Sequence, residues 1–115
     1  MKQNTFLIYL GDAKTMPLKA LYTETGDPVD LTSCTEIVVN LPLAANAGFL
    51  QLKYSLGQVN ITSPPVLGKF TVPISAANSV NLNPDIEQNI DVAFTISGNT
   101  FTVRFYKALT VREAP

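Results

Sequence analysis

The chain has 115 residues, which is enough for one hydrophobic core and leaves no room for a second domain. Eight Lys and Arg residues against nine Asp and Glu residues give a formal net charge of −1, without blocks of like charge. This balance argues against nucleic acid or an anionic membrane as an electrostatic partner. No stretch contains the roughly 20 apolar residues that span a bilayer. We therefore expect a single domain over residues 1–115 that is soluble or part of a soluble assembly.

Charged residues make up only 15% of the chain and apolar residues 46%, whereas typical soluble domains are about 25% charged. The surface is therefore expected to be unusually neutral. Because charged residues are depleted at the centres of protein interfaces, this composition favours a protein whose sides are covered by neighbours. The alternative is a monomer with a neutral surface rich in Thr and Asn.

The chain contains one cysteine, Cys34, and no histidine. An internal disulfide is excluded, and the usual proton shuttle at neutral pH and the commonest zinc ligand are missing. No serine lies in a G-x-S-x-G motif. The sequence therefore predicts no catalytic residue, no cofactor and no metal centre, and Cys34 is expected to be a small buried hydrophobe.

The first third of the chain predicts three strands, over residues 4–10, 15–23 and 35–43. The apolar run 6–10 ends at Gly11 and Asp12 and is too short for a signal peptide. In the third strand, Ile37, Val39 and Leu41 alternate with more polar residues and should share one buried face. Between the second and third strands, residues 24–28 (Glu24, Thr25, Gly26, Asp27 and Pro28) predict a turn.

The middle of the chain predicts a meander and then an edge strand. Residues 49–54 and 58–62 should form neighbouring strands about a turn at residues 55–57. Alternating apolar residues predict a further strand over residues 70–74, and Pro73 places it at a sheet edge or a bulge because proline cannot donate a ladder hydrogen bond. Residues 75–88 predict a loop with at most one short helix.

The last part of the chain predicts a β-hairpin, with strands over residues 90–96 and 100–106 about a turn at residues 97–99. Lys107 falls on the apolar side of the second strand before Leu109 and Val111 resume it, so we expect a bulge, a strand end or an exposed stretch there. The whole pattern gives seven to eight short strands. It predicts an all-β fold, an antiparallel sandwich or a small barrel.

Six acidic residues are candidates for chemistry that needs no histidine: Asp12, Asp27, Asp30, Asp85, Glu87 and Asp91. Two carboxylates can hydrolyse a glycoside, and Asp27 and Asp30 together with Asp85 or Glu87 could surround a calcium ion. However, Asp beside Gly or Pro is typical of turns, and the spacing matches no calcium-binding loop. The turn interpretation is therefore favoured.

The aromatic residues divide into two groups. Five phenylalanines lie on the apolar side of predicted strands and are expected in the core: Phe6, Phe70, Phe94, Phe101 and Phe105. Four tyrosines are candidates for interface contacts, with satisfied tyrosines in the core or at sheet edges as the alternative: Tyr9, Tyr22, Tyr54 and Tyr106.

The order of several short motifs resembles virion domains of tailed bacteriophages, notably the immunoglobulin-like N-terminal domain of baseplate upper proteins. In that family a Gly-Asp pair near the N-terminus precedes a strand, and a G-x-P-V-D-L-T turn leads into the next strand. The matching segments here are Tyr9-Leu10-Gly11-Asp12, Met16-Pro17-Leu18, Gly26-Asp27-Pro28-Val29-Asp30-Leu31-Thr32, Ile37-Val38-Val39, Gly68-Lys69-Phe70-Thr71-Val72 and Leu109-Thr110-Val111. The motif residues Gly11, Asp12, Gly26, Asp27, Pro28, Asp30 and Leu31 are all explained by turn geometry.

The resemblance implies an immunoglobulin-like sandwich and a non-enzymatic structural protein of the virion, made in the host bacterial cytoplasm. Baseplate upper proteins continue into further domains whereas this chain stops at Pro115, so a tail, head–tail or capsid decoration protein is an equal expectation. Its partners would be copies of itself and other virion proteins, contacted through sheet edges and through residues 1–5 and 108–115. The alternative function is a module that binds a carbohydrate or a host receptor.

Overall fold

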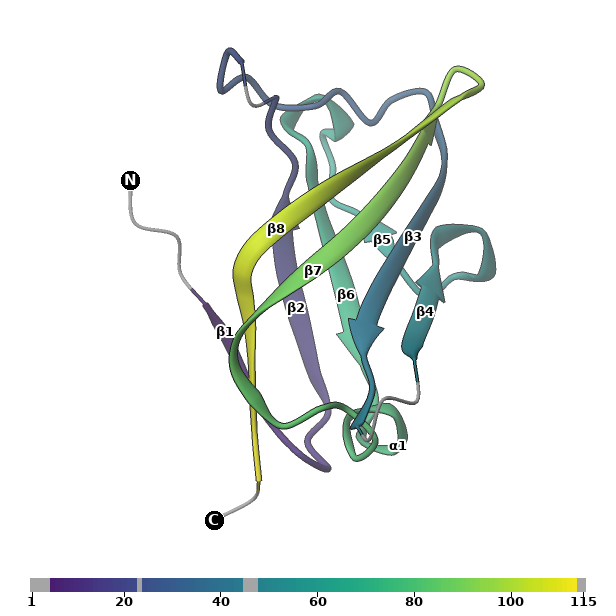
Figure 1. Ribbon diagram of the computed structural model, residues 1–115. Helices are drawn as coiled ribbons and strands as arrows, with labels where there is room; N and C mark the ends of the chain where they lie inside the picture. Colours follow the sequence, from purple (N-terminus) through teal and green to yellow (C-terminus); the bar gives the residue numbers. More distant parts are fainter. Residues whose placement is uncertain (1–4, 23, 45–47, 114–115) are drawn as a thin grey trace.

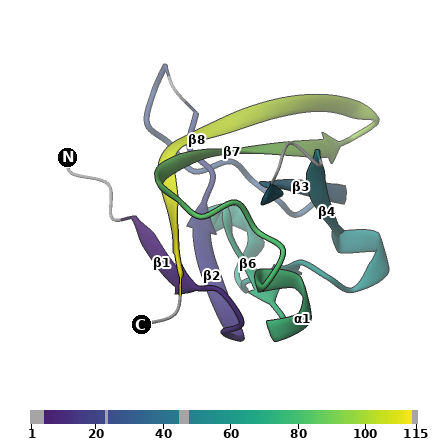
Figure 2. The ribbon, with the colours of Figure 1, turned by 60° about the horizontal axis from the view of Figure 1, so that its bottom comes forward.

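The computed structural model describes residues 5–22, 24–44 and 48–113, without the side chains of Asp85 and Ile86. Within these ranges the chain forms eight strands in two facing sheets (Figures 1 and 2). The strands are β1 (Phe6–Tyr9), β2 (Lys14–Lys19), β3 (Cys34–Pro42), β4 (Phe49–Lys53), β5 (Asn60–Ile61), β6 (Lys69–Ile74), β7 (Asp85–Ile96) and β8 (Asn99–Arg112). The described residues also form the short helices η2 (Tyr54–Leu56), η3 (Pro65–Leu67) and α1 (Ala76–Ser79).

The strand order is that of an immunoglobulin-like sandwich. One sheet has the order β1-β8-β7-β3-β4 and the other β2-β6-β5. In the immunoglobulin fold, strands B, E and D share one sheet and strands C, F and G share the other, to which variable domains add strand C′. Here β2, β6 and β5 take the places of B, E and D, and β3, β7, β8 and β4 take those of C, F, G and C′. The expected fold class is confirmed.

The expectation of a purely antiparallel sandwich is wrong at one pair. β1 runs parallel to β8, with Phe6 opposite Leu109 and Tyr9 opposite Arg112. The reason is the connection: a tight turn after β1 leads directly into β2 of the opposite sheet, so β1 must lie beside β8 in the direction that this turn imposes. All other strand pairs are antiparallel.

The strand expected over residues 15–23 ends early, at Lys19. Beyond it the Ala20 N–H donates to the Gly68 carbonyl (2.9 Å), and Leu21 forms an isolated bridge with Pro28. The chain therefore turns into the loop between β2 and β3 instead of continuing the pairing with β6. Residue 4 of the expected first strand and residue 23 of the expected second strand lie outside the described residues.

The expected meander of residues 49–54 and 58–62 is wrong. β4 pairs with β3, whereas β5 pairs with β6 in the opposite sheet. The connecting residues form η2, which ends at Gly57 in the left-handed conformation (φ 75°). The turn therefore carries the chain across the sandwich, a step that alternating apolar residues in two consecutive strands cannot reveal.

The edge position expected from Pro73 is also wrong for the strand as a whole, since β6 is the middle strand of its sheet. It holds locally. Pro73 lies opposite Thr15 of β2, but β5 pairs only with Phe70 and Thr71. β5 is too short to reach Pro73, so the missing N–H breaks no ladder on that side.

The segment 75–88 contains the expected short helix, α1, whose Ser75 hydroxyl accepts a hydrogen bond from the Asn78 N–H (3.1 Å). The expected loop is too long, however, because β7 already begins at Asp85. Register shifts between Asp85 and Ile90 weaken the period-two pattern there, which explains why the sequence did not reveal the first residues of the strand.

The hairpin of β7 and β8 is confirmed, and so is the irregularity at Lys107. Ser97 and Gly98 form a two-residue turn with positive φ (51° and 81°), the geometry that matches strand twist. Lys107 has a φ of 52°, and its N–H donates to Asn89 Oδ1 (2.8 Å). The register shift beside Lys107 is a bulge, and Figure 1 shows β8 changing direction about halfway along its length.

The core lies between the two sheets and contains three rings in edge contact. Phe70 of β6 packs against Phe94 of β7 and Phe105 of β8, with ring centroids 5.5 and 6.0 Å apart. Phe6 and Phe101 are only half-buried and pack against this core. Cys34 is buried as expected, and burial raises the pKa of its thiol.

Glu36 of β3 holds η2 against the five-stranded sheet. Its carboxylate accepts hydrogen bonds from the Ser55 N–H (2.9 Å), the Ser55 hydroxyl and the Ile37 N–H (3.1 Å). Burial alone would raise the pKa of Glu36, but these hydrogen bonds and the charge of Lys53 together lower it below its usual value. The ionised side chain is therefore stabilised by folding.

We expect Glu36→Gln to lower the free energy of unfolding at neutral pH and to have little effect in acid. The lowered pKa gives a contribution that is complete above the unfolded value of about 4.3 and is lost as pH falls through the folded value. Urea denaturation of both proteins at neutral pH and near the folded pKa measures this. Glu24→Gln, in the exposed part of the β2–β3 loop, is the control. An equal destabilisation of Glu36→Gln at both pH values would contradict the prediction.

Candidate functional site

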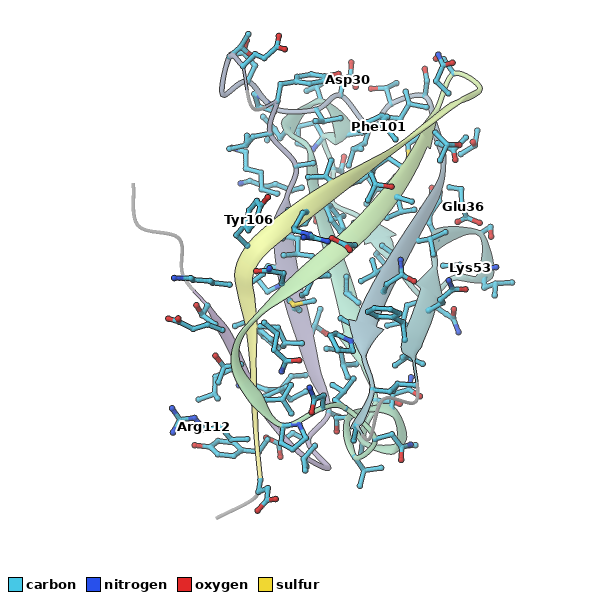
Figure 3. All side chains as sticks on the ribbon, viewed as in Figure 1. Asp30, Glu36, Lys53, Phe101, Tyr106 and Arg112 are labelled. Atoms are coloured by element: carbon cyan, nitrogen blue, oxygen red, sulfur yellow. The ribbon has the colours of Figure 1, made fainter. Side chains whose placement is uncertain are left out.

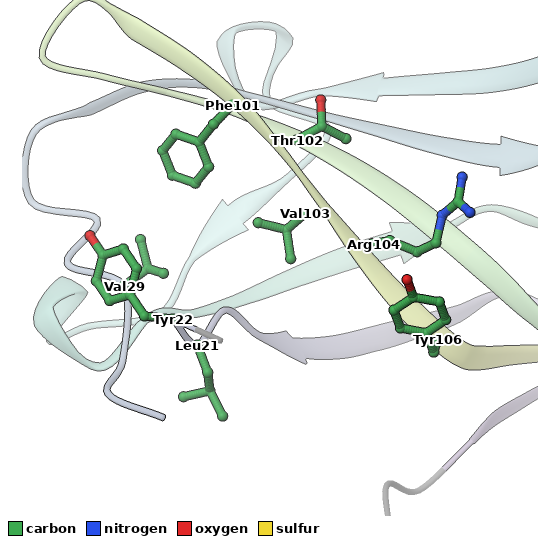
Figure 4. A pocket seen from close by; sticks show the side chains of 8 residues that line it. All are labelled: Leu21, Tyr22, Val29, Phe101, Thr102, Val103, Arg104 and Tyr106. Carbon is green, nitrogen blue, oxygen red and sulfur yellow. The ribbon is translucent and has the colours of Figure 1, made fainter. Parts of the chain in front are cut away.

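A surface depression lies between β8 and the loop that joins β2 to β3 (Figure 4). We call it the β8 groove. It has a volume of about 500 Å³, and its lining residues are Leu21, Tyr22, Val29, Phe101, Thr102, Val103, Arg104 and Tyr106. This volume is within the range of about 300–1,000 Å³ that is usual for binding sites.

The β8 groove has an apolar floor and an aromatic rim. Figure 4 shows Phe101 and Val103 projecting from β8 toward the side of Leu21 and Val29. The Phe101 ring also stacks on Phe94 of the core (5.7 Å between centroids), which fixes its position. On the rim, Tyr22 and Tyr106 are 51% and 63% exposed. Exposed tyrosines beside an apolar floor are typical of protein interfaces.

The turn predicted at residues 24–28 forms one wall of the β8 groove. The Tyr22 N–H donates to the Asp27 carbonyl and the Gly26 N–H to the Tyr22 carbonyl, both at 2.8 Å. Gly26 has a φ of 74°, which glycine adopts without strain. The bridge between Leu21 and Pro28 completes the wall. The motif residues 26–28 therefore position Leu21 and Tyr22.

The remaining motif residues have structural contacts elsewhere. Val29 and Leu31 are buried in the core, and Asp30 is exposed, where hydrogen bonds from the Thr32 hydroxyl and N–H lower its pKa. At the other end of the molecule, the Gly11 N–H donates to Ser79 Oγ (3.0 Å), and this hydroxyl donates to the Asp12 carbonyl (2.7 Å). The Gly-Asp turn is thereby attached to α1.

The structure brings together two of the four candidate tyrosines. Tyr22 and Tyr106 share the β8 groove, whereas Tyr9 lies at the end of β1 and Tyr54 packs against the core from η2. Figure 3 places Phe101 and Tyr106 on the upper half of β8, far from Arg112 at its lower end. The apolar floor was not predicted as a site, because its residues belong to two segments that only the fold makes adjacent.

The candidate acidic residues do not form a metal cage in the described part of the chain, where no three His, Cys, Asp or Glu side chains cluster suitably. Asp91 instead forms a two-point ion pair with Arg104 across β7 and β8 (2.8 and 3.2 Å). Hydrogen bonding to Arg104 lowers the pKa of Asp91. Glu87 lies 4.0 Å from the Lys107 ammonium, and the side chain of Asp85 lies outside the described residues.

The upper half of β8 also presents open main-chain groups. A two-residue turn makes Ile96 and Asn99 a hydrogen-bonded pair, and such pairs then alternate along an antiparallel ladder. The main-chain N–H and C=O of Thr100, Thr102 and Arg104 therefore point away from β7. In the described part of the chain, β1 covers this side of β8 only at residues 109–112.

No protein-family model matches the chain, and no curated protein sequence is significantly similar to it. Within the described residues, no helix has the length and apolar character needed to cross a membrane.

Proposed function

We propose that the protein is a non-enzymatic assembly protein that binds other proteins, including copies of itself, through the β8 groove. The observation that carries this proposal is the combination of an apolar floor, two exposed tyrosines and an unpaired strand edge in one place. With the sequence resemblance given above, we further propose that it acts in the virion of a tailed bacteriophage, as a tail, baseplate, head–tail or capsid decoration component.

The charges around the β8 groove support a protein partner. Arg104, the charged residue of the lining, is already paired with Asp91. An incoming surface therefore meets a neutral pair, and a highly charged ligand would find no free counter-charge in the lining. This agrees with the low charged fraction of the chain, 15%. Neutral, aromatic surfaces of this kind are typical of interface centres.

A second candidate function is the binding of a carbohydrate or host receptor, which the exposed rings of Tyr22 and Tyr106 at the mouth of the groove favour. Aromatic rings can pack against the apolar faces of sugars. Binding to a glycan array that disappears in Tyr106→Ala, with the fold intact by circular dichroism, would establish this function in place of assembly.

We expect Tyr106→Ser to weaken self-association about tenfold, since truncating an aromatic residue at an interface centre typically costs more than 1 kcal/mol. Sedimentation velocity over a wide concentration range measures the effect. Leu56→Ser is the matched control, because Leu56 is 68% exposed on η2 and does not line the groove. A wild-type protein that stays monomeric at every concentration would contradict self-association. If Tyr106→Ser dimerised as tightly as the wild type, the β8 groove would be excluded as the interface.

A further inference from the structure

We infer that a second copy of this chain adds to the open edge of β8, so that the two β8 strands pair antiparallel about a two-fold axis at Val103. This inference rests on the proposed function and specifies its partner and its geometry. The two five-stranded sheets would then join into one continuous sheet across the two copies.

The upper half of β8 has an open edge. Thr100, Thr102 and Arg104 direct main-chain donors and acceptors outward, as the register of the hairpin requires. Such a row of groups is satisfied by another extended strand, and unprotected edges are the usual sites of strand addition. In the described residues β1 leaves this part of β8 uncovered, since its pairing begins at Leu109.

The open stretch of β8 is limited at both ends. The turn at Ser97 and Gly98 limits it above, and the bulge at Lys107 bends β8 away below. At the bulge, the Lys107 carbonyl already accepts a hydrogen bond from the Thr5 hydroxyl (2.8 Å). The open stretch therefore covers residues 99–106, and its outward-facing positions run from Thr100 to Tyr106 with Val103 at their centre. A two-fold axis at Val103 pairs these positions with those of the second copy.

The open edge of β8 is complementary to the same edge of a second copy. In this register Thr102 lies opposite Arg104 of the second copy, and Phe101 lies opposite Phe105. Val103 lies opposite its own equivalent. Apolar residues thus meet apolar residues, and no charged residue faces a like charge. Each Arg104 also keeps Asp91 beside it, so the pairing buries no uncompensated charge.

The free edge of β2 shows the contrast. It carries Lys14, Pro17 and Lys19 within six residues, and lysine and proline are the residues that protect natural edges against strand addition. The stretch 99–106 of β8 contains neither. Lys107 lies at the bulge that ends the open stretch. The β8 edge therefore lacks the protection that the β2 edge has.

Substitutions at Thr102 test the register, because its side chain is exposed and lies opposite Arg104 of the second copy. We expect Thr102→Lys to weaken dimerisation about tenfold, since the two-fold axis creates two like-charge pairs in each dimer. Thr102→Glu should dimerise at least as tightly as the wild type, and Thr102→Val is the neutral control. Sedimentation equilibrium gives the dissociation constants, and thermal unfolding at low concentration confirms that all variants remain folded.

The outcomes separate this inference from the proposed function. Equal dimerisation of the Lys and Glu variants, together with weakening by Tyr106→Ser, would overturn strand pairing and leave assembly through the groove standing. Loss of dimerisation in both charged variants would overturn the register. A wild-type chain that never dimerises would overturn the inference, and the proposed function would then depend on binding to other proteins.

Discussion

Replacing Gly68 with alanine is expected to lower the free energy of unfolding by about 2–5 kcal/mol. Gly68 follows η3 with a φ of 69°, a conformation that costs other residues about 1–2 kcal/mol. A Cβ atom there would also lie 2.6 Å from the Ala20 carbonyl oxygen and 2.9 Å from the Val29 carbonyl oxygen. Both are main-chain atoms, so relief requires movement of the β2–β3 loop, and overpacking of this kind costs about 1–3 kcal/mol more.

Gly57→Ala is the matched control for this prediction. Gly57 ends η2 with a φ of 75°, but a Cβ atom there would meet nothing within 4 Å. It should therefore show the conformational cost of about 1–2 kcal/mol alone. Urea denaturation of the two variants measures the difference. Equal destabilisation would mean that the close approach of Gly68 to the loop contributes nothing.

Phe70→Ala is expected to lower the free energy of unfolding by about 3–5 kcal/mol, the range for removal of a buried phenylalanine ring. Phe70 is fully buried and is the ring of the three-stranded sheet that contacts both Phe94 and Phe105 of the other sheet. Its loss leaves a cavity between the layers. Since small domains have only about 5–15 kcal/mol of stability, the variant should unfold at a much lower urea concentration.

Phe70→Leu is the control, because it keeps an apolar side chain between the sheets and should cost clearly less. If the alanine variant were no less stable than the leucine variant, the sheets would have closed over the cavity. The β8 groove of the Phe70→Ala variant should be intact at low temperature, because the Phe101 ring stacks on Phe94 and not on Phe70. Tyrosine fluorescence of the folded variant can follow this.

The sequence predicted those parts of the fold in which local pattern and local structure agree. Alternation along β3 and β7 gave their buried faces, and Gly98 marked the hairpin turn. Lys107 marked the bulge because a lysine on the apolar side conflicts with burial. These features depend on a few neighbouring residues each, so they can be derived without knowing the partner strands.

Features that depend on distant segments could not be derived in this way. The crossing from β4 to β5 occurs at η2, whose residues are compatible with an ordinary hairpin turn. Of the β8 groove, Tyr22 and Tyr106 were identified by residue type, but Leu21 and Val103 line the same groove only because the loop after β2 returns to β8. The open edge required a further fact, namely that β1 pairs with the last part of β8 alone.

The pairing of β1 with β8 has a consequence for the order of folding. Phe6 lies opposite Leu109, so this contact joins segments from nearly opposite ends of the sequence. Contacts of such separation close large loops and form slowly, and during synthesis the ribosome must release β8 before β1 has a partner. We therefore expect β1 to remain unpaired until the hairpin of β7 and β8 has formed, and to join the sheet last.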